Sequence, residues 1–371
     1  MKINKVILYT SEFPPLYGGI GNQAYNLADF FYRKGIEIEV ITHHRGVLDG
    51  EEIEFDRKLN YKVRRNLHFK IDSFTYAFRV LASIINLSKT KNVYIIASGK
   101  FPIYLIGFLS MFFTKNKYLA IIHGSEINVV GFLGKLLMKR SIIKFHKVIT
   151  VSNFTNNILL NLVPKVKSVV INNGFTMKGD KLEKLGNKLP GYPNLVTVGS
   201  MSKRKGQHNV IMAIPEMLKT FPTLHYHVIG IPVELERLKN LAIGLNVIDN
   251  VTLHGALNDT QVKEIYNSTD VFMMLSENLA NGEVEGFGIA ILEANSRGIP
   301  AIGSKNSGIA DAISNFETGR LVDPHNPSQI SNALIEIINN YERFSKNAEV
   351  WSEKFNWEVI GQKYLDEMLD Q

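Results

Sequence analysis

Short apolar segments alternate with longer amphipathic segments along the whole chain. Residues 5–9 form an apolar, β-branched run, residues 22–34 repeat apolar side chains at helical spacing, and residues 37–42 form a second apolar run. This strand–helix–strand order predicts a parallel sheet with helices on both faces. Further strands are predicted at 93–97, 119–123, 147–151, 195–199, 224–229, 251–254, 271–275 and 300–303.

A polar stretch rich in glycine and proline divides the chain. The alternation weakens between residues 177 and 193, and a new apolar segment follows directly. The length of 371 residues also exceeds the roughly 250–300 that one hydrophobic core supports. We therefore predict an α/β fold of two doubly wound, Rossmann-like domains facing a cleft, at residues 1–177 and 194–356, with a linker at 178–193.

Charge is divided unevenly between the two halves. Residues 1–180 hold 25 lysines and arginines against 12 aspartates and glutamates, a balance of +13, whereas residues 181–371 hold 17 against 23, a balance of −6. The basic half is expected to attract an anionic partner. Nucleic acid is not the expected one, because no recognised binding motif is interleaved with the basic residues.

Several classes of protein are excluded by what the sequence lacks. Without cysteine there is no disulfide scaffold, cysteine zinc site or thiol catalysis. P-loop, Gly-x-Ser-x-Gly and Asp-x-Asp motifs are missing, which argues against a P-loop NTPase, a serine hydrolase of that type and a Mg²⁺-diphosphate site of that type. No apolar segment reaches the roughly 18 residues of a membrane span, and the first residues resemble a strand, not a signal peptide. We therefore expect a cytoplasmic protein.

The most informative segment runs from Glu285 to Glu293. Gly286 and Gly288 precede a predicted helix at 289–296, and bare backbone N–H groups at such a start favour a phosphate or a sugar hydroxyl. Glu285 precedes the helix and Glu293 lies about one turn inside it, so separate contacts with a long ligand are expected. The alternative is that Glu285 caps the helix and Glu293 is solvated.

A basic loop follows the predicted strand at 195–199. Lys203, Arg204 and Lys205 lie at the carboxyl end of that strand, where open α/β sheets bind ligands. Cations at this position suit a diphosphate. A basic loop that is only solvated is the alternative.

Two further segments follow predicted strands in the first half. Gly19 and Gly21, with a later alanine, imitate a dinucleotide fingerprint, but the long interval after the strand instead favours a loop that approaches a ligand across the cleft. His123 ends another strand and is expected to point into the crevice. His123 and Glu126 lack a third ligand at a recognised metal spacing.

Taken in this order, these residues resemble a retaining GT-B glycosyltransferase of family GT4. The resemblance covers nearly the whole chain, and its most specific part is the segment from Glu285 to Glu293. Ser200 departs from the pattern, since many relatives carry arginine there. The other matching segments are Phe13-Pro-Pro with Gly-Gly-Ile-Gly21, His123-Gly-Ser-Glu126, Val151-Ser152, Asn173-Gly174 and Val198-Gly199 with Arg204-Lys205-Gly206.

In such enzymes the C-terminal domain binds a nucleotide-sugar donor and the N-terminal domain binds the acceptor. The resemblance implies that Arg204 and Lys205 hold the donor diphosphate, and that Glu285 and His123 are the catalytic residues beside the donor sugar. Glu293 would bind the ribose hydroxyls. The other implied contacts are Gly19, Gly21, Gly288 and Ile289 with the diphosphate, and Gly286 and Phe287 with the donor sugar.

The resemblance also implies a reaction. A hexose-type sugar would pass with retention from a nucleotide-diphosphate sugar to a glycan or polyprenyl-linked acceptor, as in O-antigen, capsule or lipopolysaccharide assembly. The leaving phosphate would take the acceptor's proton, and cations with a helix N-terminus would replace a metal, so no metal or other cofactor is expected. A sugar-nucleotide epimerase of the same fold and a non-catalytic nucleotide-sugar-binding protein are the alternatives.

Two segments leave their placement open. The uncharged run 101–113 and the basic amphipathic stretch 131–144 favour contact with an anionic membrane, at the inner face of the plasma membrane, over simple packing on the sheet. Residues 357–371 are expected from the resemblance to pack back on the first domain. The hydrophobic pattern alone fits a helix that completes the second domain equally well.

Overall fold

The computed structural model divides the chain into two compact units. One unit contains Met1–Gly174 and Trp357–Gln371, and the other contains Phe175–Asn356. The predicted linker at 178–193 lies outside the described residues as far as position 188. The structure describes residues 3–16, 18–44, 50–67, 71–129, 131–176 and 189–370.

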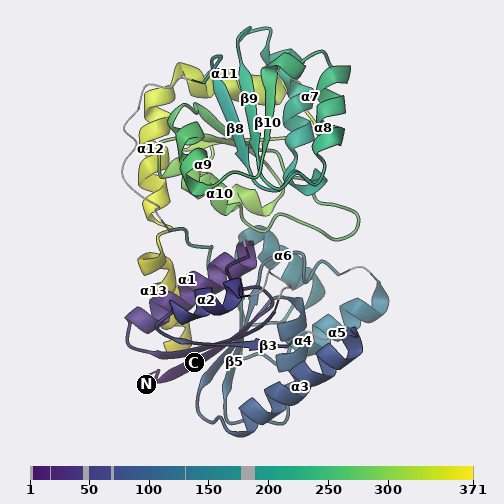
Figure 1. The fold of residues 1–371 in the computed structure, drawn as a ribbon, viewed down its shortest axis with the longest axis vertical. Coiled ribbons are helices and arrows are strands. Elements are labelled where there is room, and N and C mark those ends of the chain that lie inside the picture. Colours follow the sequence, from purple (N-terminus) through teal and green to yellow (C-terminus); the bar gives the residue numbers. More distant parts are fainter. Residues whose placement is uncertain are drawn as a thin grey trace. The chain divides into compact units, whose positions relative to one another are not determined.

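The first unit is built on a parallel sheet of seven described strands in the order β3-β2-β1-β4-β5-β6-β7. The order reverses between β1 and β4, which is where ligands bind at the carboxyl ends of such sheets. The strands are β1 (Lys5–Thr10), β2 (Glu37–His43), β3 (Lys62–Asn66), β4 (Tyr94–Ser98), β5 (Lys117–Ile122), β6 (Lys147–Thr150) and β7 (Ser168–Val170). The helices are α1 (Gly19–Arg33), α2 (Glu51–Arg57), α3 (Asp72–Ser88), α4 (Lys100–Leu109), α5 (Phe132–Ile142), α6 (Asn153–Leu162) and α13 (Trp357–Leu369) (Figure 1).

The second unit repeats this plan with a sheet in the order β10-β9-β8-β11-β12-β13. Its order reverses between β8 and β11. The strands are β8 (Asn194–Val198), β9 (His225–Ile229), β10 (Val251–Gly255), β11 (Val271–Met274), β12 (Ala301–Ser304) and β13 (Gly319–Val322). The helices are α7 (Gln207–Met217), α8 (Leu235–Gly244), α9 (Asp259–Asn267), α10 (Ile289–Asn295), α11 (Pro327–Asn339) and α12 (Tyr341–Glu353).

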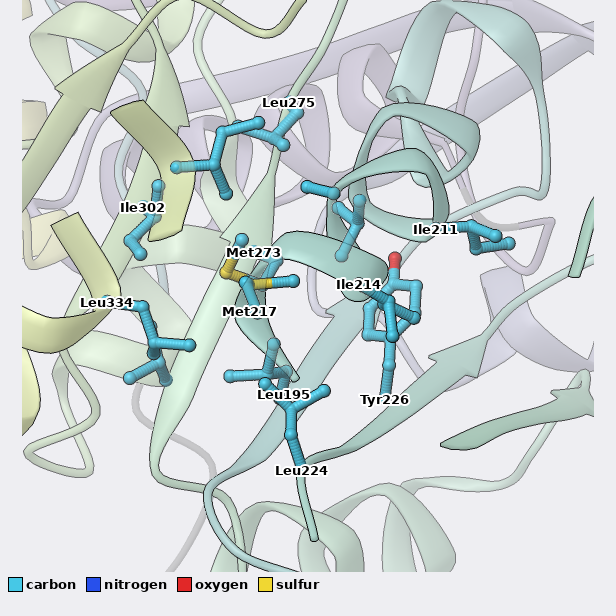
Figure 2. Close-up of a cluster of buried hydrophobic side chains, with 14 of the residues drawn as sticks. Leu195, Ile211, Ile214, Met217, Leu224, Tyr226, Met273, Leu275, Ile302 and Leu334 are labelled. Carbon is cyan, nitrogen blue, oxygen red and sulfur yellow. The ribbon is translucent and has the colours of Figure 1, made fainter. Parts of the chain in front are cut away.

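A dry core fixes the second sheet against its helices. Figure 2 shows Leu195, Tyr226 and Met273 of three strands facing Ile214 and Met217 of α7, and all of these side chains are fully buried. Each such side chain contributes about 1.5–3 kcal/mol by leaving water. The carboxyl ends of β8 and β11 are therefore held on a rigid base.

The predicted fold class, two doubly wound Rossmann-like sheets, is confirmed, and the predicted strands differ from the observed ones by one or two residues at their ends. Three strands were not predicted, namely β3, β7 and β13. Each lies at the edge of its sheet. Edge strands bury less surface, and β3 has the sequence Lys-Val-Arg-Arg-Asn, which carries no apolar run.

The C-terminal helix α13 belongs to the first unit. The Gln23 amide of α1 donates a hydrogen bond to the Tyr364 hydroxyl over 3.1 Å. A Cβ on Gly361 would lie only 2.4 Å from the ring of Phe30, so the two helices approach closely.

Among the described residues, no helix combines the length and the apolar character needed to cross a bilayer.

Candidate active site

Three ionised side chains meet in the second unit, at the carboxyl ends of β8 and β11. Arg204 and Lys205 lie in a 3₁₀ turn just before α7, and Glu285 lies in the loop before α10. The Lys205 ammonium is 2.9 Å from Oε2 of Glu285, and the Arg204 guanidinium contacts the same oxygen. The structure therefore brings together the two segments that the sequence singled out.

The carboxylate of Glu285 is largely shielded from water, with 8% of the residue exposed. Burial by itself would raise the pKa of this carboxyl, but Lys205 and Arg204 outweigh burial and hold the pKa below its ordinary value. Glu285 is therefore an anion at neutral pH. Its two cationic partners are themselves only partly exposed.

Glycines allow the backbone to close tightly around this site. Gly206 has a φ of +75°, and a Cβ there would lie 1.8 Å from the carbonyl oxygen of Leu275. A Cβ on Gly308 would lie 2.0 Å from the carbonyl oxygen of Gly286. Only glycine fits both positions.

The helix after Glu285 begins as the sequence predicts. Gly288, in the left-handed conformation, is its N-cap, and no side chain caps it, so Glu285 is not a helix cap. Glu293 lies inside α10, is partly exposed, and accepts a hydrogen bond at its backbone carbonyl from Arg297 over 2.7 Å. The two glutamates thus occupy separate places, and the predicted role of Glu293 at the ribose stays a prediction.

A second polar network, which the sequence analysis missed, supports the basic turn. Glu277 accepts one hydrogen bond over 2.8 Å from Asn209 and pairs with the ring of His208 over 2.8 Å. Its backbone N–H donates to the carbonyl of Arg204. Burial opposes ionisation of Glu277, but Asn209 and His208 prevail and lower its pKa. The available signal was an acidic residue two positions after a predicted strand.

His123 lies in the first unit, directly after β5. Its Nε2 is 2.9 Å from the hydroxyl of Ser98, and its backbone N–H donates to the Glu126 carboxylate over 2.6 Å. Burial lowers the pKa of His123 to about 4, so the imidazole is neutral at physiological pH. Glu126 is buried and bonded to backbone amides of its own loop, so it serves the loop instead of pairing with the His123 ring.

The other predicted contacts have the following positions. Gly19 and Gly21 lie in the first turn of α1, which begins at Gly19 instead of the predicted residue 22. The additional turn is closed by a hydrogen bond from the backbone N–H of Asn22 to the carbonyl of Gly18 over 2.9 Å. Lys203 is exposed beside the two paired cations. Gly286, Phe287 and Ile289 flank Gly288 at the start of α10.

Two parallel Rossmann-like sheets, with a charged site at the switch point of the second, are the architecture of GT-B glycosyltransferases. Two family models match the chain: "Glycosyltransferase Family 4" over residues 17–177 and "Glycosyl transferases group 1" over residues 180–351. The chain therefore belongs to this glycosyltransferase family, as the resemblance predicted.

Characterised relatives and solved structures agree with this assignment. A GDP-mannose-dependent monoacylated alpha-(1-6)-phosphatidylinositol monomannoside mannosyltransferase of Corynebacterium glutamicum is 26% identical over 97% of this chain and 96% of its own length. A related mannosyltransferase of Mycobacterium tuberculosis is 26% identical, and the match spans about half of that relative, 48% of each chain. The structure of HepE from Anabaena in complex with UDP and glucose has a TM-score of 0.77 at 17% identity, covering 99% of this chain and all of that one, which shows a common fold.

Proposed function

We propose that this protein is a retaining glycosyltransferase that moves a hexose-type sugar from a nucleotide-diphosphate sugar to a glycan or lipid-linked acceptor. The observation that carries the proposal is the convergence of Arg204 and Lys205 on the buried Glu285, at the switch point of the second sheet. Cell-surface polysaccharide assembly is the setting that such acceptors suggest.

The arrangement suits departure of a diphosphate. Negative charge grows on the leaving phosphate during transfer, and Arg204 and Lys205 neutralise it within a partly buried site. When the diphosphate takes these cations, Glu285 is released to accept hydrogen bonds from the donor sugar near its reacting carbon. The amides around Gly288 then meet the sugar and the distal phosphate. In this proposal the cations do the work of a metal ion.

The donor can be found with a panel of nucleotide-sugars. Names of similar proteins mention GDP-mannose and UDP with glucose, so the panel contains both sugars on both nucleotides. Thermal stabilisation grows as RT ln(1 + [L]/Kd), so the true donor will shift the unfolding temperature most. An NMR assay then follows the anomer formed on an acceptor sugar. Absence of any nucleotide-sugar binding contradicts the proposal.

The same assays separate the alternatives. A sugar-nucleotide epimerase changes the donor when no acceptor is present, and NMR detects the new sugar directly. A non-catalytic binding protein is stabilised by the nucleotide-sugar but changes it neither alone nor with acceptors. Retaining transfer predicts a product only when an acceptor is added.

We also propose that the first unit contacts an anionic membrane at the inner face of the plasma membrane. Helix α5 carries Lys135, Lys139 and Arg140, which complement anionic lipid. Apolar side chains are exposed on α3, α4 and α5 and just beyond α4, namely Phe74, Tyr76, Phe78, Leu81, Ile84, Ile85, Phe108, Met111, Phe112, Phe132, Leu133 and Leu137. A lipid-linked acceptor would lie in such a membrane.

Sedimentation with vesicles tests the membrane proposal. Vesicles containing phosphatidylglycerol should bind the protein, and pure phosphatidylcholine vesicles should bind it less. The pair Phe74→Ser and Leu133→Ser should weaken binding, because both side chains are more than 60% exposed. Val233→Ser is the control, since Val233 is 70% exposed but lies in the second unit. Equal binding of all variants, or none at any salt concentration, contradicts the proposal.

A further inference from the structure

Helix α3 buries polar residues and exposes apolar ones, the reverse of an ordinary surface helix. Its buried residues are Thr75, Arg79, Ser83 and Leu87, which follow one another at four-residue intervals and therefore share one face. Phe74 and Leu81 on other faces are 63% and 55% exposed. The proposed membrane contact would account for the outer face, but the inner polar face needs a separate explanation.

The inner face of α3 lines a small cavity at the carboxyl ends of β1 and β2. The cavity encloses about 30 Å³. A single water needs only ~10–15 Å³, so there is room for a small terminal group but not for a sugar ring. The cavity is lined by Tyr9, Thr10, Ser11, Ile41, Thr42, His43, Asn66, Arg79, Ser83, Phe101, Pro102 and Leu105.

Two polar groups of this lining, the hydroxyl of Thr42 and the Nε of Arg79, have no hydrogen-bond partner among the described residues. The hydroxyls of Tyr9 and Ser83 interact with each other, which still leaves one of the two O–H groups able to donate to a third group. All four residues are at least nine-tenths buried. Burial raises the pKa of Tyr9, so its hydroxyl keeps its proton and can donate. A buried donor without a partner destabilises the folded protein, which indicates that this cavity receives a hydrogen-bond acceptor.

Arg79 gives the cavity its charge. Only 7% of this residue is exposed, and within the described ranges no carboxylate forms an ion pair with its guanidinium. Asp72, on the same helix, acts on it only at longer range. The guanidinium lies 5.5 Å from the ring centre of Phe101 and 5.6 Å from that of Tyr76. These rings hold the cation without using its N–H groups, so its donors stay available.

We infer that this cavity binds an oxyanion of the acceptor, a phosphoryl or carboxylate group, with Arg79 as its counter-ion and Tyr9, Thr42 and Ser83 as donors. A buried arginine without a carboxylate partner is costly until an anion arrives. The inference rests on the proposed function only in naming the acceptor as the source of that anion. It identifies the acceptor class as anionic.

The cavity is connected to His123 through β4. Ser11, in the cavity lining, donates its backbone N–H to the carbonyl of Ser98 over 3.0 Å, and the Ser98 hydroxyl lies 2.9 Å from His123. Strands β1 and β5 flank β4, and neighbouring strands lie about 4.8 Å apart. The cavity lining on β1 and the histidine after β5 thus lie two strand spacings, roughly 10 Å, apart along the same edge of the sheet.

Binding of three soluble probes to the full chain tests the inference. Glucose 1-phosphate, glucuronic acid and methyl glucoside carry a phosphoryl group, a carboxylate and no charge, respectively. The titrations use both the unchanged protein and Lys205→Ala, which weakens phosphate binding at the proposed donor site. We expect at least one anionic probe to bind both proteins, and methyl glucoside to bind neither. The stronger of the two anions identifies the acceptor group.

Matched variants locate the binding. Arg79→Gln should weaken the binding of the anionic probe by roughly 10- to 100-fold in Kd, the equivalent of one charge-assisted contact. Lys89→Gln, which removes an exposed cation at the end of the same helix, should leave it unchanged. Ser83→Ala gives a second, milder variant in case Arg79→Gln does not fold, and should also weaken the probe.

The outcomes remain separable from those of the proposed function. If nucleotide-sugars fail to bind but the anionic probe depends on Arg79, the cavity assignment stands and the proposed function fails. If nucleotide-sugars bind but neither anion binds, the cavity holds only water and the inference is wrong. The inference is also wrong if an anion binds with the same affinity in the Arg79→Gln and Ser83→Ala variants as in the unchanged protein. With a natural acceptor, Arg79→Gln should raise the acceptor KM and leave the donor KM unchanged.

Discussion

The ammonium of Lys205 lies 2.9 Å from the carboxylate of Glu285, on the same oxygen that Arg204 contacts. One buried carboxylate is thus paired with both of the cations assigned to the donor diphosphate. In the proposed function, an arriving diphosphate would exchange one anion for another at these cations, so their charge would be compensated in both states. The exchange would also couple donor binding to the release of Glu285 toward the donor sugar.

Glu285→Gln is expected to abolish sugar transfer while nucleotide binding persists. The substitution leaves Arg204 and Lys205 without their anion, so the free protein should be less stable. A nucleoside diphosphate should then raise the unfolding temperature more than it does in the unchanged protein. Thermal unfolding with and without UDP and GDP measures this. The control is Glu283→Gln, an exposed glutamate of the same loop; full transfer by Glu285→Gln contradicts the assigned role.

Lys205→Ala is expected to weaken nucleoside diphosphate binding. A charge-assisted contact contributes about 1.5–3 kcal/mol, which corresponds to roughly 10- to 100-fold in Kd. Isothermal titration gives the affinity. Lys203→Ala removes a neighbouring but exposed cation and should change the affinity little. Equal losses in the two variants would mean that the loop acts only through its general charge.

Gly206→Ala should damage both stability and donor binding. Its φ of +75° disfavours alanine, and the new Cβ would lie 1.8 Å from the Leu275 carbonyl oxygen. Gly255→Ala is a matched control, because its φ is +73° and nothing lies within 4 Å of its Cβ. Strain alone costs about 1–2 kcal/mol, so Gly255→Ala should lose about that much in the free energy of unfolding. Denaturant titrations should show a clearly larger loss for Gly206→Ala.

A histidine cluster in the second unit predicts acid sensitivity. Nδ1 of His227 is 3.0 Å from Nε2 of His254, and the ring of His225, also on β9, is tilted against that of His227 with ring centres 4.7 Å apart. Burial, with the neighbouring histidines, lowers the pKa of His227 to about 3. The unfolded chain therefore binds protons that the folded chain does not, and stability should fall as the pH falls from about 6.5 toward 3.

Denaturant titrations across this pH range measure the effect. His227→Gln should make the pH dependence shallower, because the substituted side chain no longer titrates. His254→Gln removes the partner of His227 and should also make the dependence shallower, because burial lowers the pKa of His254 as well. A pH dependence that is the same in all three proteins would show that other groups cause the acid sensitivity.

His123 should not titrate in the working range of the protein. Its pKa of about 4 leaves the imidazole neutral above pH 5. The pH profile of kcat/KM for transfer should therefore show no step near 6.5 that disappears in His123→Gln. Such a step would mean that bound substrates restore an ordinary pKa to this histidine.

The central strands of both sheets were predictable because they are buried on both faces and form apolar runs. Edge strands such as β3 were not predictable, because they pair on one side only and bury less surface, so their sequences need no apolar run. The hydrophobic pattern of α13 did not show which of the two units this helix packs against. That choice depends on tertiary contacts such as the hydrogen bond between Gln23 and Tyr364, which join residues far apart in the sequence.

The site was predictable in part for a similar reason. Arg204, Lys205 and Glu285 each follow a predicted strand of one sheet, so topology brings them together. The cavity around Arg79 was not predictable, because α3 has the composition of an apolar helix. Only the structure shows that its polar residues face inward.

The most direct test of the account is a crystal structure of the full chain with a bound nucleotide-sugar. The account predicts diphosphate oxygens within hydrogen-bond distance of Arg204 and Lys205, with Glu285 released from both and turned toward the sugar. A nucleotide bound elsewhere, with the three side chains still paired with one another, would contradict it.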